Sequence, residues 1–297
     1  MPGTDGKPAN GWDLAWPAPA KLNLCLLITG RRDDGCHRLQ TAYQIVDLCD
    51  FVQFSELPDG QFTLSGGLHS VPPDQDLCMQ AARMLYERCQ PGIGAAITLQ
   101  KNIPIGAGLG GGSSDAATTL LALNRLWRAG LDREELAGIG LKLGADVPLF
   151  VLGESAWGEE LGEKLTPVKW PRRWFLVVNP GVSISTREIF SAPELTRNST
   201  PITIRSFLND GAGNDCESTV RGRYGEVDEA LVWLSRFGRS RLSGTGSCVF
   251  AAFERRQDAA AAQAEVPEKW GHWLVRGLDT SPVSDSLLNE GARPAGR

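Results

Sequence analysis

The chain has 297 residues, a formal net charge of -5 and a pI of about 5.4. Its hydrophobic fraction of 42% and charged fraction of 22% are ordinary for a globular protein, and its length suggests one large or two modest domains. A nucleic-acid-binding protein usually carries a basic face or tail, which this sequence lacks, and the acidic balance also argues against binding to an anionic membrane.

The seven cysteines predict a reducing compartment. Their number is odd and no two have C-x-x-C spacing, which disfavours a disulfide framework and a structural zinc site. No apolar run approaches the roughly 18 residues of a membrane span. Met1 to Asn10 lacks the apolar stretch of a secretory signal. We therefore expect a cytoplasmic protein.

The order of the predicted elements indicates the fold class. Residues 18–28 alternate polar and apolar side chains, which predicts a half-buried strand. In the first half of the chain, the remaining predicted elements are strands over 43–54 and 62–64, a helix over 75–89, a strand over 95–99, a helix over 115–127 and a helix from Asp132. Asp74 is the predicted N-cap of the helix over 75–89, and Glu135 completes a capping box with Asp132. In the second half, the predicted elements are a strand over 174–179, a helix over 226–237, strands flanking a loop within 241–253, a helix over 258–264 and a strand over 272–276.

Strands and helices mix here without strict alternation. That order favours an α+β, two-lobed protein over a regular parallel sheet. We place the boundary between residues 155 and 170 and predict domains over 1–164 and 165–297. The tail from Thr280 onward is polar, has few large apolar residues, and is predicted to fray.

The strongest single signal is a glycine-rich segment from Pro104 to Asp115. It holds five glycines in seven residues, 106–112, so its backbone N–H groups are not covered by side chains. Successive bare amides can curve around an anion, and the helix that follows adds its positive N-terminal end. Ser113 and Ser114 supply hydroxyls at the helix start. Such a loop suits a triphosphate.

Two other kinds of phosphate-binding loop are also rich in glycine. The Walker loop needs a Lys after its last Gly, and none is present. The dinucleotide pattern G-x-G-x-x-G is matched by Gly106, Gly108 and Gly111, with Asp132 about 20 residues further on. Asp132, however, is predicted to cap a helix, and no βαβ pattern surrounds the loop. A nicotinamide enzyme is therefore the weaker alternative.

Three further segments carry polar residues of the right chemical types. Lys21 and Asn23 lie on one face of the first strand, Asp146 follows a helix in Gly-Ala-Asp-Val-Pro, and residues 242–247 form a second loop of small residues. Each has an ordinary structural explanation when taken alone, namely a solvated strand face, a helix cap and a turn.

Together the four segments resemble the GHMP kinase superfamily. The resemblance runs from about Trp16 to about Leu278 and is greatest to the members that phosphorylate the 2-hydroxyl of a cytidine-diphosphate-linked methylerythritol in non-mevalonate isoprenoid biosynthesis. It rests on P-A-K-L-N-L at 19–24, D-G-C-H at 34–37, the glycine loop, G-A-D-V-P at 144–148 and S-G-T-G at 243–246. It implies a two-domain GHMP kinase fold with the active site in the cleft between the domains.

The resemblance also implies roles for single residues. Asp146 matches the catalytic Asp that accepts the substrate hydroxyl proton, and Lys21 matches the catalytic Lys that keeps this Asp ionised and stabilises the developing charge. ATP with Mg²⁺ is the expected phosphoryl donor, and we expect a monomer or a homodimer. The implied nucleotide-binding residues are Lys101, Pro104, Gly106, Gly108, Leu109, Gly110, Gly111, Gly112, Ser113 and Ser114. The implied substrate-binding residues are Asn23, Cys36, His37, Thr186 and Phe190.

Three positions depart from the pattern of that group. Cys36 stands where the group usually has a Tyr that stacks on the cytosine, Asp76 stands where it commonly has Asn near the adenine, and residues 160–163 read E-L-G-E where it tends to have G-x-G-E. The lost stacking surface favours one alternative, a superfamily kinase for a smaller alcohol. A second alternative is a catalytically silent relative that binds a nucleotide or metabolite. The presence of both Lys21 and Asp146 argues against the silent relative.

Overall fold

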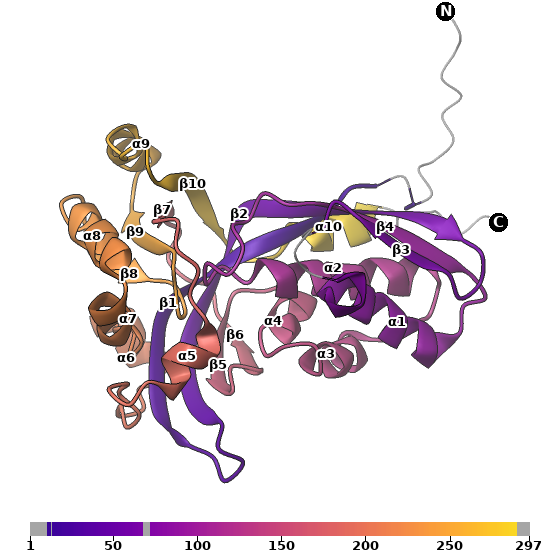
Figure 1. Ribbon diagram of the computed structural model, residues 1–297, viewed down its shortest axis with the longest axis horizontal. Helices are drawn as coiled ribbons and strands as arrows, with labels where there is room; N and C mark the ends of the chain where they lie inside the picture. The colour runs from indigo at the N-terminus through magenta and orange to yellow at the C-terminus, as the bar shows by residue number, and fades with distance from the viewer. Residues whose placement is uncertain (1–10, 13, 68–71, 290–297) are drawn as a thin grey trace, which may run out of the picture.

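The computed structural model describes residues 11–12, 14–67 and 72–289 (Figure 1). Met1 to Asn10, for which the sequence predicts no secretory signal, lie outside the described residues. Within the described part, none of the helices has the length and apolar character needed to span a bilayer.

The longest strands, β1 (Trp16–Arg31) and β2 (His37–Leu57), form an antiparallel hairpin at the centre of the fold. Its register pairs Lys21 with Ile45 and Asn23 with Tyr43, and it shifts between Pro19 and Lys21 and again between Asn23 and Cys25. These β-bulges bend the hairpin, as irregular pairings do. The bent hairpin therefore extends along both halves of the molecule (Figure 1).

The N-terminal domain is a sheet covered on one face by helices (Figure 1). Its further strands are β3 (Phe62–Ser65), β4 (Gly94–Gln100), β5 (Ala156–Glu160) and β6 (Lys164–Pro167). Its helices are the short η1 (Pro73–Gln75), α1 (Leu77–Cys89), α2 (Gly111–Leu126), α3 (Arg133–Leu141) and α4 (Val147–Leu152). The core between the two layers includes Phe54, Leu85, Leu120 and Phe150, all buried.

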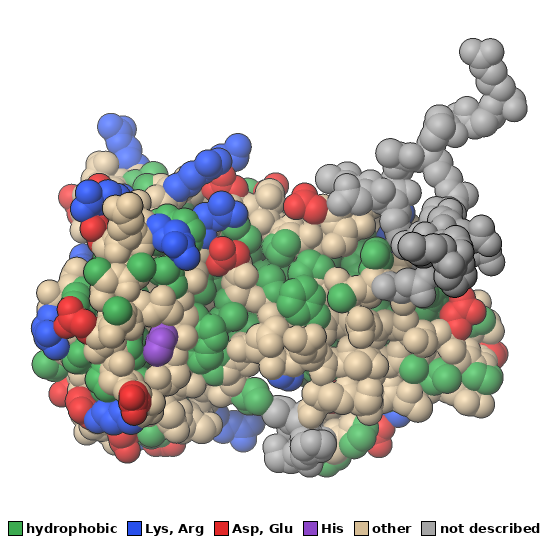
Figure 2. All heavy atoms as spheres, turned by 90° about the horizontal axis from the view of Figure 1, so that it is seen from above, with side chains coloured by type: hydrophobic (Ala, Val, Ile, Leu, Met, Phe, Trp, Pro, Cys, Tyr) green, Lys and Arg blue, Asp and Glu red, His purple; other side chains and the backbone are tan. Residues whose placement is uncertain are grey.

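The C-terminal domain repeats this two-layer plan with a separate core. Its strands are β7 (Trp174–Asn179), β8 (Ser240–Leu242), β9 (Val249–Phe253) and β10 (Gly271–Leu278). Its helices are α5 (Thr186–Ser191), α6 (Ile204–Asp210), α7 (Glu217–Arg223), α8 (Gly225–Leu234) and α9 (Arg256–Ala264). Leu176, Val227 and Leu231 lie in the second core. Seen from above, this domain shows basic and acidic side chains intermixed, with hydrophobic side chains over the middle of the molecule (Figure 2).

Strand β10 joins the two domains into one sheet. Its last residues, Gly277 and Leu278, pair with Val46 and Ile45 of β2, so the strand order is β3-β4-β2-β10-β7-β9-β8. The α+β, two-domain architecture predicted from the element order is thus confirmed.

Two local predictions were wrong. Within the described residues, the segment after Thr280 does not fray, because it forms α10 (Pro282–Asn289), whose Val283 is buried in the N-terminal core. The rest of the predicted tail, residues 290–297, lies outside the described residues. The N-cap of α1 is Asp76 and not Asp74, since the Asp76 carboxylate accepts from the Cys78 N–H at 2.8 Å. The capping box of Asp132 and Glu135 at the start of α3 is confirmed.

Candidate active site

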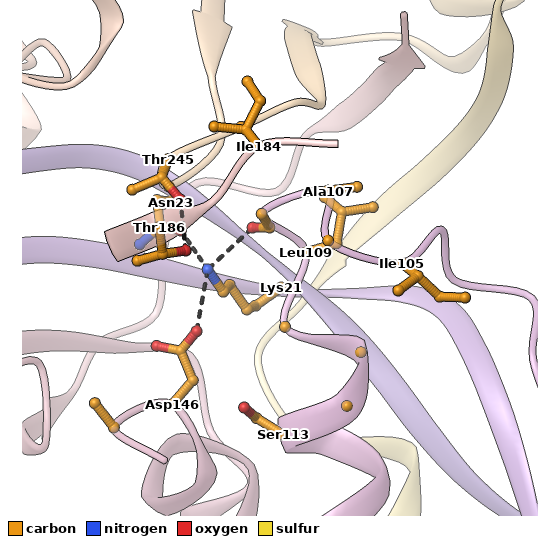
Figure 3. Close-up of a pocket in the computed structure, with 18 of the residues that line it drawn as sticks. Lys21, Asn23, Ile105, Ala107, Leu109, Ser113, Asp146, Ile184, Thr186 and Thr245 are labelled. Atoms are coloured by element: carbon orange, nitrogen blue, oxygen red, sulfur yellow. Dashed lines mark hydrogen bonds and ion pairs between the residues drawn. The ribbon is translucent and has the colours of Figure 1, made fainter. Parts of the chain in front are cut away.

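A cavity of about 460 Å³ lies between the two domains, and residues from both line it (Figure 3). Most of the site residues predicted from the sequence line this cavity: Lys21, Asn23, Lys101, Pro104, Gly106, Gly108, Leu109, Gly110, Gly111, Gly112, Ser113, Asp146, Thr186 and Phe190. Ser114 is fully buried beside it in α2, and its hydroxyl has no hydrogen-bond partner in the described structure.

The Lys21 ammonium lies at the centre of the cavity wall (Figure 3). It is 3.3 Å from Asp146 Oδ2 and donates to Asn23 Oδ1 and, at 3.0 Å, to the Gly108 carbonyl oxygen. Lys21 is only 4% exposed, whereas the Asp146 side chain is 29% exposed and so remains open to the cavity. The predicted cation–carboxylate pair, 125 positions apart in sequence, is therefore formed.

Asp146 occupies a different place in its helix from the one that its sequence context indicated. It precedes α4 as the N-cap residue, yet its side chain makes no capping hydrogen bond. The carboxylate points instead toward Lys21 (Figure 3). Ordinary N-cap residues of this type accept from a first-turn N–H. Asp146 is thus directed at the cavity and not at its own helix.

The glycine loop needs its glycines for both conformation and space. Gly106, Gly108 and Gly110 have φ of +62°, +75° and +72°, which side chains rarely tolerate. A Cβ on Gly108 would lie 2.1 Å from the Ser243 carbonyl oxygen, and one on Gly110 would lie 3.1 Å from Lys21 Cε. The loop therefore packs directly against the second loop of small residues and against the lysine.

The start of α2 presents backbone donors to the cavity. Its N-cap is Gly110, which has no side chain to cap the first turn, and Gly111, Gly112 and Ser113 line the cavity. The first N–H groups of a helix have no intrahelical acceptor and carry the positive end of the helix dipole. This end of the cavity is suited to a phosphate group.

Comparison with known proteins identifies the family. The chain matches the family model "GHMP kinases N terminal domain" over residues 76–154 and "GHMP kinases C terminal" over residues 194–272. It is 54% identical to the 4-diphosphocytidyl-2-C-methyl-D-erythritol kinase of Alkalilimnicola ehrlichii, over 94% of this chain and 96% of that protein. It is 49% identical to the protein of that name from Pseudomonas aeruginosa, over 92% of this chain and 97% of that one. This chain belongs to the family of 4-diphosphocytidyl-2-C-methyl-D-erythritol kinases.

Solved structures agree with this membership. A crystal structure of 4-(cytidine 5'-diphospho)-2C-methyl-D-erythritol kinase superposes with a TM-score of 0.79 at 31% identity, covering 89% of this chain and 100% of the other. A mevalonate kinase shares the fold, with a TM-score of 0.66 at 16% identity, covering 90% of this chain and 100% of the other. Membership in this kinase family rules out the alternative of a nicotinamide enzyme.

The domain boundary that the sequence predicts at residue 164 stays a prediction. The N-terminal family model ends at residue 154 and the C-terminal family model begins at residue 194, so neither model reaches the boundary.

A second cavity adjoins the first, and Phe190 lines both. Cys36 and His37 line this second cavity, and the rings of His37 and Phe190 stack with centroids 5.2 Å apart. His37 Nε2 accepts from Arg197 Nε at 3.1 Å. Burial and the Arg197 charge lower the pKa of His37, so its ring is neutral and can accept this bond. The three predicted cytidine-contacting residues thus lie together, next to the Lys21 cavity.

Lys101 lies behind the glycine loop, in a buried ion-pair cluster that the sequence did not predict. Its ammonium is 2.6 Å from Asp115 Oδ2 in α2 and also bonds Asp50 of β2. Burial raises the pKa of Asp115 to about 7, with the Lys101 charge opposing the rise. Since Asp50 also accepts from the Ile103 N–H at 2.7 Å, the cluster ties β2 to both ends of the glycine loop. A direct contact of Lys101 with the nucleotide stays a prediction.

Sequence reasoning also missed the residues that orient Asn23. The Asn23 amide donates to Thr41 Oγ1 at 2.8 Å, and this hydroxyl donates in turn to the Cys25 carbonyl at 2.7 Å. Because the amide nitrogen is engaged there, Asn23 Oδ1 faces Lys21. Tyr43, next along the same face of β2, donates to Asp146 Oδ1 at 3.1 Å. Alternation along β2 was the available signal, since it places positions 41 and 43 on one face.

The packing of the glycine loop yields a first prediction. Gly108→Ala is expected to weaken ATP binding at least about tenfold, because the new Cβ must displace either the loop or residue 243, at a cost of roughly 1–3 kcal/mol. Isothermal titration calorimetry measures the affinity. Gly130→Ala is the matched control, with a similar φ of +74° but no atom within 4 Å of the new Cβ. Unchanged ATP affinity in Gly108→Ala would contradict the assigned role of this loop.

Proposed function

We propose that Lys21 and Asp146 carry out the reaction of this family, transfer of the γ-phosphoryl group of ATP to the 2-hydroxyl of 4-(cytidine 5'-diphospho)-2-C-methyl-D-erythritol. The reaction is a step of non-mevalonate isoprenoid precursor biosynthesis. The observation that carries the assignment is the 3.3 Å ion pair between these two residues, beside the glycine loop.

The proposed step needs one base and one cation. Asp146 accepts the proton of the 2-hydroxyl while the hydroxyl oxygen bonds the γ-phosphorus, and the bond from that phosphorus to the bridging oxygen breaks, leaving ADP. Lys21, held by Asn23 and Gly108, supplies positive charge where the transferred group gains negative charge. The cavity would hold the substrate hydroxyl and the γ-phosphate in the right relative position, which is the main requirement for phosphoryl transfer.

The amides at the start of α2 and the glycine loop are proposed to hold the ATP phosphates. Support comes from the left-handed glycines and the uncapped first turn. Mg²⁺ is proposed to accompany ATP, neutralising charge between the phosphates. Ser113, whose hydroxyl lies at the helix start near Asp146 (Figure 3), fits as a protein oxygen beside such an ion. Most other ligands would be phosphate oxygens and water.

The substrate is proposed to span the two adjoining cavities. Its cytidine would contact His37, Phe190 and Cys36 in the second cavity, and its methylerythritol would contact Asn23 and Thr186 near Lys21. Support comes from Phe190, which lines both cavities, and from Thr186, whose hydroxyl is 3.0 Å from that of Thr245 in the second loop of small residues.

We further propose a cytoplasmic enzyme, active as a monomer or a homodimer. All seven cysteines lie among the described residues and are free thiols. Free thiols are typical of a reducing compartment. Sedimentation velocity distinguishes the two oligomeric states.

The exchange Asp146→Asn tests the proposed base. The amide cannot accept the hydroxyl proton, so kcat for the cytidyl substrate is expected to fall by about 10²- to 10⁴-fold, while ATP affinity stays within a factor of about two. ADP release in the presence of ATP, Mg²⁺ and the substrate gives the rate, and calorimetry gives the affinity. Retention of more than a tenth of the wild-type kcat would remove Asp146 from the base role.

Cys36 offers a test of the cytidine subsite. Cys36→Tyr adds a stacking surface worth roughly 1–3 kcal/mol, so KM for the cytidyl substrate should fall about tenfold with kcat nearly unchanged. Cys36→Ser, which adds no ring, is the control and should leave KM unchanged. A large change of kcat in Cys36→Tyr would place residue 36 near the chemistry instead of near the cytidine.

A further inference from the structure

The two oxygens of the Asp146 carboxylate are held by two different side chains. Asp146 Oδ2 faces the Lys21 ammonium at 3.3 Å, and Asp146 Oδ1 accepts from the Tyr43 hydroxyl at 3.1 Å. One contact alone would leave a carboxylate free to rotate about its Cβ–Cγ bond, because that torsion has a broad energy profile. Two contacts on opposite oxygens fix the plane of the carboxylate.

Tyr43 is a permanent donor in this arrangement. It is 3% exposed. Burial raises the pKa of its phenol well above the ordinary value, and the neighbouring Asp146 carboxylate raises it further. The phenol therefore keeps its proton near neutral pH. An ionised carboxylate can only accept, so the direction of the bond is fixed.

The chain around Tyr43 holds the ring in place. The Trp170 indole N–H donates to the Tyr43 carbonyl at 2.8 Å, and β5 and the turn after it come close to the ring at Gly158 and Gly162. A Cβ on Gly158 would lie 2.7 Å from Tyr43 Cε2, and one on Gly162 would lie 2.4 Å from the phenol oxygen. The turn thus leaves room for a tyrosine with its hydroxyl and for little else.

We propose that Tyr43 is a positioning residue for phosphoryl transfer, whose hydroxyl sets the orientation of the Asp146 carboxylate toward the substrate hydroxyl. The inference rests on the proposed function of Asp146. Tyr43 itself does not contact the reacting atoms and acts through Asp146. The ring also lies 5.8 Å below the Lys21 ammonium, so one side chain contacts both members of the pair.

The exchange Tyr43→Phe tests this role with little change of shape. We expect kcat for the cytidyl substrate to fall about tenfold to a hundredfold, the range given by loss of one hydrogen bond to a charged group. KM values and ATP affinity should stay within twofold. Tyr86→Phe is the matched control, because the Tyr86 hydroxyl also bonds a carboxylate, that of Asp59, at 2.5 Å on the exposed surface away from the cavity.

The pH profile separates positioning from general stability. Among the described residues, the titratable groups facing Asp146 are Lys21 and Tyr43, and Glu163 faces the phenol. A carboxylate that has lost a donor binds a proton more readily. The acidic limb of the kcat profile should therefore move to higher pH in Tyr43→Phe and stay in place in Tyr86→Phe. An unchanged kcat and an unmoved limb in a folded Tyr43→Phe protein would overturn the proposal.

A second exchange, at Gly162, tests the Tyr43 hydroxyl by crowding its oxygen instead of removing it. Gly162→Ala places a methyl group against the phenol oxygen and should lower kcat in the wild-type background but much less in the Tyr43→Phe background, where that oxygen is absent. Equal losses in the two backgrounds would contradict the proposal.

A measurement without substrate keeps this inference separate from the proposed function. If the wild-type protein failed to phosphorylate the cytidyl substrate, the proposed function would fall. Carboxyl ¹³C NMR of Asp146 would still test Tyr43, since loss of the phenol donor should shift the Asp146 carboxyl resonance in Tyr43→Phe. An Asp146 resonance that is unchanged in Tyr43→Phe would overturn the role of Tyr43.

Discussion

The buried Lys21 ammonium constrains the site more than any other group. An ammonium removed from water is costly unless its protons find acceptors. Its acceptors here are Asn23 on the same strand, Gly108 in the glycine loop and Asp146 before α4. Because these acceptors come from three separate segments, pairing the Lys21 charge fixes the Asp146 carboxylate and the glycine loop relative to each other.

The same constraint connects the two domains. The Gly108 carbonyl accepts from Lys21 and, at 2.9 Å, from the Ser243 hydroxyl of the C-terminal domain. The Cys248 N–H donates to the Ala107 carbonyl at 3.1 Å. The wall of the cavity is therefore a hydrogen-bonded contact between two loops of small residues, and a side chain at position 108 would separate them. Family membership, the fold and the position of the cavity are consistent with a kinase built around this contact.

The sequence revealed the residues whose chemical type is required and missed those whose role depends on tertiary contacts. The glycines could be found because bare amides before a helix suit a phosphate, and Lys21 and Asp146 could be found through the resemblance of their segments to the GHMP kinases. Tyr43 could not, since a tyrosine in a β-rich segment is also an ordinary strand residue, and its contact depends on the β1–β2 register and the β5–β6 turn. The prediction of Asp74 as N-cap is wrong because η1, with Pro73 at its start, shifts the beginning of α1 by two residues. In α10, burial of Val283 by the distant N-terminal core outweighs a polar local composition.

A crystal structure with the cytidyl substrate and a non-hydrolysable ATP analogue tests the central claim most directly. The account predicts the substrate 2-hydroxyl about 3 Å from the Asp146 carboxylate, in line with a γ-phosphate that contacts Lys21 and the amides of residues 110–113. A substrate hydroxyl bound out of reach of Asp146, or a triphosphate held away from these amides, would contradict it.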